Sequence, residues 1–95
     1  MIISQLSIAP VGKGVSISRY IKEIVKILTN NGIKFKINPM STIIETKDLK
    51  SLFRIIENLN EHLFKLGVKR VITDLKIDFR KDKDATMESK LKSIN

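Results

Sequence analysis

The sequence predicts an α+β domain of the ferredoxin-like type, with the element order βαββαβ and a short helix at its C-terminal end. Four segments have the two-residue alternation of strands, and two longer segments have the spacing of amphipathic helices. With right-handed connections, both long helices lie on one face of a four-stranded antiparallel sheet. A chain of 95 residues has the size of one domain, so residues 1–95 are expected to fold as a single unit.

The first strand and the first helix occupy the beginning of the chain. Residues 2–9 alternate in their pattern, and Pro10 with the glycines that follow ends the strand. A serine, Ser16 or Ser18, is expected to cap a helix that extends to about Asn30. Its apolar residues share one stripe: Ile17, Tyr20, Ile21, Ile24, Val25 and Leu28.

Two strands, a helix and a long last strand follow. Residues 33–37 alternate between apolar residues and lysines, which indicates a strand with one wet face at a sheet edge, and residues 41–45 form the next strand. Asp48 caps a helix that ends at Leu66, and residues 68–79 form the fourth strand. The second helix has its own apolar stripe: Leu49, Leu52, Phe53, Ile56, Leu59, Leu63 and Leu66.

Two further predictions concern the C-terminal tail and the two faces of the sheet. Arg80 to Asp84 form a charged turn, and residues 85–94 form a short helix capped by Asp84. Three strands have adjacent apolar residues and therefore apolar side chains on both faces: Ile2 and Ile3, Ile43 and Ile44, Val71 and Ile72. Because the helices cover only one face, we expect the other to be buried in a homo-oligomer.

Composition excludes several classes of function. The absence of cysteine rules out disulfides, thiol catalysis and cysteine-bound metals. No apolar run approaches about 20 residues, and no signal peptide is recognisable, so we expect a cytoplasmic protein with no membrane contact. The net charge of +8 suggests anionic partners. However, the lysines are scattered and the first and third strands have no aromatic residue on which bases stack, so we expect no specific nucleic-acid binding.

Candidate catalytic and metal-binding features are weak. Gly12-Lys13-Gly14 precedes a helix but does not match a phosphate-binding loop, and an ordinary turn explains it better. His62, the only histidine, has no second ligand at a metal-binding spacing. An acylphosphatase-like enzyme needs an arginine after the first strand, and none precedes Arg19. We therefore expect no enzyme activity, no metal and no cofactor.

Glu45 is the most informative single residue because it is an acid in an apolar strand, within INPMSTIIET. A carboxylate removed from water needs a cation or hydrogen bonds. One interpretation is a cross-strand ion pair with Lys36 or Lys76. The other is a cationic or amidine-like ligand held at a subunit interface.

Three stretches resemble the thiamine-binding protein family: MIISQLSIAPVGKGVSISRYI, PMSTIIE and KRVITDLKIDFRKDKDATMESKLKSI. The resemblance covers almost the whole chain. It implies the ferredoxin-like fold, dimers paired through their sheets into a homotetramer, and binding of thiamine or its hydroxymethyl-pyrimidine part without chemistry. The family usually reads PMGT-x-IEG, where this chain has Ser41 and Thr46 in place of the two glycines.

The resemblance also suggests a set of ligand-binding residues. Thr42 and Glu45 match the family motif, whereas Gln5 and Ser7 are added because we assign them to the open face of the first strand. A carboxylate or carboxamide can pair with an aminopyrimidine, and Glu45 can also offset the charge of the thiazolium. The alternative function is a structural or regulatory homo-oligomer that binds no small ligand.

Overall fold

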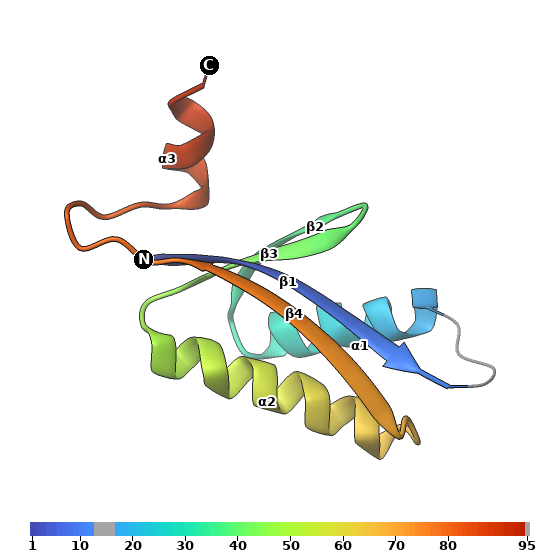
Figure 1. The fold of residues 1–95 in the computed structure, drawn as a ribbon. Helices are drawn as coiled ribbons and strands as arrows, with labels where there is room; N and C mark the ends of the chain where they lie inside the picture. The colour runs from blue at the N-terminus through green and yellow to red at the C-terminus, as the bar shows by residue number, and fades with distance from the viewer. Residues whose placement is uncertain (13–16, 95) are drawn as a thin grey trace.

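A computed structural model of the chain describes residues 1–12 and 17–94 and confirms the predicted element order (Figure 1). The elements follow one another along the chain as β1 (Ile2–Val11), α1 (Ile17–Asn30), β2 (Lys34–Asn38), β3 (Ser41–Thr46), α2 (Leu49–Lys65), β4 (Arg70–Asp78) and α3 (Met87–Lys92). None of the helices that the structure describes is long and apolar enough to span a membrane.

The four strands form one antiparallel sheet in the order β2-β3-β1-β4, which is the predicted ferredoxin-like arrangement and places β2 at an edge. Helices α1 and α2 lie against one face, whereas α3 lies on the opposite side (Figure 1). We call this second side the open face. The radius of gyration is 14.0 Å, against about 12 Å for a compact domain of this length, because α3 projects away from the sheet.

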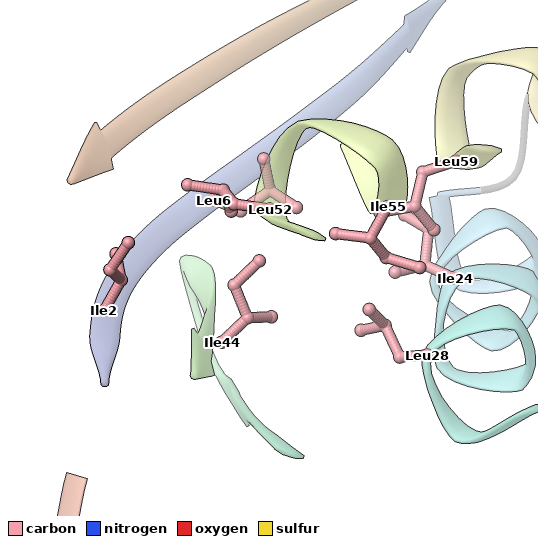
Figure 2. Packing of buried hydrophobic residues seen from close by; sticks show 8 residues of the cluster. All are labelled: Ile2, Leu6, Ile24, Leu28, Ile44, Leu52, Ile55 and Leu59. Atoms are coloured by element: carbon pink, nitrogen blue, oxygen red, sulfur yellow. The ribbon is translucent and has the colours of Figure 1, made fainter. Parts of the chain in front are cut away.

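The hydrophobic core lies between the sheet and the two long helices (Figure 2). Its buried side chains come from β1, β3, α1 and α2: Ile2, Leu6, Ile24, Leu28, Ile44, Leu52, Ile55 and Leu59. A smaller cluster of Tyr20, Leu63 and Val68 closes one end. Every β1 and β3 residue in the larger cluster has an even number, so the odd-numbered residues of β1 and β3 face the open side.

The helix α2 begins as predicted but buries a different set of side chains. The Asp48 carboxylate accepts a hydrogen bond of 2.7 Å from the Ser51 N–H, and this bond holds the pKa of Asp48 below its ordinary value. Phe53 was expected in the core but is 51% exposed, whereas Ile55, absent from the predicted stripe, is 2% exposed. Residues 52, 55, 59 and 63 recur every three to four positions, and residue 53 lies about 100° away from that line.

Several boundaries also differ from the sequence prediction. Strand β1 continues through Pro10, because beyond Leu6 it pairs only with β4, and a proline is tolerated where a strand has one neighbour. Helix α3 is shorter than expected and its cap is Thr86, whose hydroxyl accepts from the Ser89 N–H at 3.1 Å. Asp84, the predicted cap, forms an ion pair with the N-terminal amine instead.

The loop before α1 lies partly outside the described residues. This applies to Lys13 and Gly14 of the Gly12-Lys13-Gly14 turn and to Ser16, one of the two predicted caps. Ser18, the other predicted cap, lies inside α1.

Candidate functional site

A cavity of about 460 Å³ lies on the open face, between the sheet and α3. Side chains from all four strands and from α3 surround it. The residues that line it are Ile3, Ser4, Gln5, Lys36, Asn38, Ile43, Lys76, Asp78, Met87, Lys90 and Leu91. Its size lies in the range of about 300–1,000 Å³ that is typical of small-molecule sites.

The strand register arranges the floor of this cavity as a row that crosses all four strands. Lys36 pairs with Ile43, Ile43 pairs with Gln5, and Gln5 pairs with Lys76. Paired residues of neighbouring strands point to the same face of a sheet, so the floor has an apolar and an amide side chain in the middle and a lysine at each end. We call these four residues the floor row.

The neighbouring row explains how α3 is attached. It consists of Lys34, Glu45, Ile3 and Asp78, which are also paired across the four strands. The Met87 N–H, at the start of α3, donates a hydrogen bond of 2.8 Å to Oε1 of Glu45. The Glu45 carboxylate is thereby covered by the chain itself.

Two ion pairs fix α3 further along its length. Lys34 pairs with Glu88, and this contact raises the pKa of the lysine and lowers that of the glutamate. Lys90 pairs with Asp78, where the hydrogen bond from the lysine holds the pKa of the aspartate below its ordinary value. Both pairs are half-exposed, so each contributes little to overall stability and mainly orients the helix.

The structure places Glu45 on the open face, as expected, and only 6% of it is exposed. The predicted ion pair with Lys36 or Lys76 is wrong. Lys34 is the cross-strand neighbour of Glu45, and its Nζ lies 3.9 Å from Oε2. Lys36 and Lys76 are instead aligned with Ile43 and Gln5, one pleat further along.

The other three predicted ligand residues lie in different places. Gln5 is exposed and lies in the floor row. Ser7 is on the open face beyond the cavity, and its hydroxyl donates to the Met40 carbonyl at 3.2 Å. Thr42 pairs with Leu6 and therefore faces the helices, where it is buried beside a second cavity of about 250 Å³. Thus only Gln5 lines the larger cavity, next to the covered Glu45.

The open face is less apolar than the sequence suggested. Ile3, Ile43 and Ile72 do point to it, but the two outer strands contribute mainly charged residues there. The α3 helix covers the end that contains Ile3, which is 8% exposed. Sequence reasoning considered Lys36 and Lys76 only as ion-pair partners of Glu45. It missed their place in the cavity and the α3 residues that line it, because only strand register and helix position bring these residues together.

Other charged contacts lie away from the cavity. His62 of α2 and Glu23 of α1 form a pair with a distance of 2.8 Å between Nε2 and Oε2, which links the two helices. In the predicted charged turn, the Arg80 guanidinium binds both carboxylate oxygens of Asp82 and lowers the pKa of Asp82 to about 2. Within residues 1–12 and 17–94, no group of three acids or histidines is arranged to hold a metal ion.

Known proteins resemble this chain in both sequence and fold. A family model described as thiamine-binding protein matches residues 4–95. The UPF0045 protein YqgV of Bacillus subtilis is 39% identical over 100 residues, which cover 100% of this chain and 95% of the relative. The UPF0045 protein MJ1052 of Methanocaldococcus jannaschii is 37% identical over 93 residues, covering 98% of this chain and 91% of that protein. The crystal structure of MJ1052 matches with a TM-score of 0.86 at 36% identity, over 98% of this chain and 94% of the crystallised one.

Proposed function

The chain belongs to the thiamine-binding protein family, and on this premise we propose that it binds thiamine, or its hydroxymethyl-pyrimidine part, in the cavity between the sheet and α3. The observation that carries the proposal is the cavity of about 460 Å³ with an exposed amide, Gln5, in its floor. The protein acts by binding, without converting the ligand.

The lining suits an aminopyrimidine. Ile3, Ile43, Met87 and Leu91 offer apolar surface on two sides of a flat ring. The Gln5 carboxamide has an N–H₂ donor and a C=O acceptor, which match a ring nitrogen and the neighbouring exocyclic amine. A site with mostly apolar walls and few directed polar groups is the common design for small ligands.

Glu45 contributes to this site indirectly. Its carboxylate already accepts from the Met87 N–H and lies near Lys34, so we assign it to holding the α3 wall of the cavity in place. Gln5 is the residue of the predicted set that we assign to direct contact. Ser7 and Thr42 lie outside this cavity, and Ser41 and Thr46, which replace the family glycines, do not line it either.

We also propose that the protein is a cytoplasmic homotetramer, in which a second copy covers the outer side of α3. None of the six residues of α3 is buried, and two large apolar side chains at this end of the molecule that do not line the cavity are exposed: Phe79 at 53% and Ile94 at 79%. Such residues favour an interface. A neighbouring copy there would also close the cavity from the side that α3 leaves open.

Isothermal titration calorimetry of the purified protein with thiamine and with hydroxymethyl-pyrimidine tests the function. We expect saturable binding of both, weakened about tenfold by Gln5→Met, since a lost hydrogen bond in a binding site costs on the order of 1.4 kcal/mol. Asn30→Ala is the control, because Asn30 is exposed at the end of α1 on the far side of the sheet. Absence of binding by either compound would instead support a structural or regulatory oligomer without a ligand.

A further inference from the structure

The cavity has more positive than negative charge. Three lysines line it, Lys36, Lys76 and Lys90, but only one carboxylate, that of Asp78. Asp78 is already paired with Lys90. Among the described residues, neither Lys36 nor Lys76 forms an ion pair, although Asp74 lies on the same face of β4 two residues from Lys76. Two ammonium groups at the cavity are therefore available to a ligand.

These two lysines lie at opposite ends of the floor row. Lys36 is on β2 and Lys76 is on β4, with Ile43 and Gln5 between them. Three strand spacings of about 4.8 Å separate their backbones, and each side chain has a flexible four-carbon stem. Both ammonium groups can therefore converge on one anionic group above the middle of the floor.

Unmodified thiamine has the wrong charge for this arrangement. Its thiazolium is cationic, and the one acid that lines the cavity, Asp78, is already paired with Lys90. Glu45, in the neighbouring row, already accepts from the Met87 N–H. A phosphate ester adds a charge of about −1.5 to −2 and three acceptor oxygens, which lysines bind well. The same charge that disfavours the free cation therefore favours its phosphorylated form.

We propose that the cavity selects a phosphate ester of an aminopyrimidine compound, with Lys36 and Lys76 binding the phosphate and Gln5 and the apolar walls binding the ring. This inference rests on the proposed function, and it names the chemical form of the ligand. The floor row then holds the phosphate, while Ile3, Met87 and Leu91 contact the heterocycle beneath α3.

Calorimetric titrations with thiamine, thiamine monophosphate and inorganic phosphate test the proposal. We expect the monophosphate to bind at least about tenfold more tightly than thiamine. Each of Lys36→Gln and Lys76→Gln should reduce monophosphate affinity about tenfold and should not reduce thiamine affinity, because these lysines repel the thiazolium cation. The affinity for the monophosphate should also fall more steeply with added salt. Lys22→Gln and Lys50→Gln, exposed on the helices, are matched controls that should have no effect.

Each contrary outcome identifies what fails. Equal affinities for thiamine and its monophosphate would overturn the phosphate assignment and leave the proposed function intact. A preference that survives in the Lys36→Gln, Lys76→Gln double variant would overturn the assignment of these lysines. Binding of inorganic phosphate as tight as that of the ester would show a general anion site, and binding of neither thiamine compound would overturn both proposals.

Discussion

Removing the Glu45 carboxylate should release α3 from the sheet. In the native structure its Oε1 accepts from the Met87 N–H at 2.8 Å, and its Oε2 lies 3.9 Å from Lys34. A charge-assisted hydrogen bond contributes about 1.5–3 kcal/mol, and a loose pair with a half-exposed lysine contributes less than about 1 kcal/mol. Because α3 has no buried residue, these contacts are a large share of what holds it.

Glu45→Ala should therefore cost about 2 kcal/mol of α3 attachment. That free energy corresponds to roughly a thirtyfold increase in the population with α3 detached. Glu45→Gln should have a smaller effect, since its amide oxygen still accepts from the Met87 N–H.

Hydrogen exchange of backbone amides measures this directly. In Glu45→Ala, amides of residues 87–92 should exchange faster, while those of β1 and α2 should keep their native protection. Glu57→Ala, an exposed acid on α2, is the control. If both Glu45 variants leave exchange in α3 unchanged, or if protection is lost equally throughout the chain, then Glu45 does not act as the local anchor of α3.

Three further predictions concern stability and assembly. The Thr46 hydroxyl is buried without a hydrogen-bond partner among the described residues, so Thr46→Val should raise the free energy of unfolding in urea by about 1 kcal/mol, and a decrease would reveal a hidden partner. The hydrogen bond from His62 lowers the pKa of Glu23 from its ordinary value of 4.5. The ionised carboxylate therefore stabilises the folded state at a pH above 4.5, and this stabilisation is lost as the pH falls through the lower pKa of the folded state. Thermal unfolding between pH 6 and 3 should accordingly show a smaller acid-induced loss for Glu23→Gln than for the wild type, and equal losses would contradict this. Light scattering should show smaller particles for Phe79→Ser combined with Ile94→Ser than for the wild type, and unchanged mass would exclude this end of the molecule from the interface.

Local patterns in the sequence were enough to predict most of the fold. The alternation of residues 33–37 and the apolar spacing in both long helices have one dominant physical cause, burial of one side against a core. Asp48 was recognisable as a cap because its short side chain satisfies a free N–H at the start of α2. The error at Phe53 arose because Phe53, Ile55 and Ile56 are all apolar, so the sequence pattern did not show which of them lies on the core stripe.

The candidate site was less predictable because its parts are distant in the sequence. Gln5 could be assigned to the open face from the alternation of β1, but its neighbours Lys36 and Lys76 depend on the register of three strand pairs. Thr42 was included because it matches the family motif, but it lies three residues from Glu45 on the same strand and therefore faces the other side of the sheet. The position of α3 depends on long-range contacts that no local pattern contains.

The bond between Met87 and Glu45 has a consequence for how related sequences can vary. Its donor is a main-chain N–H, so any residue except proline at position 87 retains it, whereas position 45 must keep an acceptor of the same reach. Substitutions at these two positions should therefore be uncorrelated among homologues. The ion pairs of Lys34 with Glu88 and of Lys90 with Asp78 join side chain to side chain, and their charges should change together or be reversed as pairs.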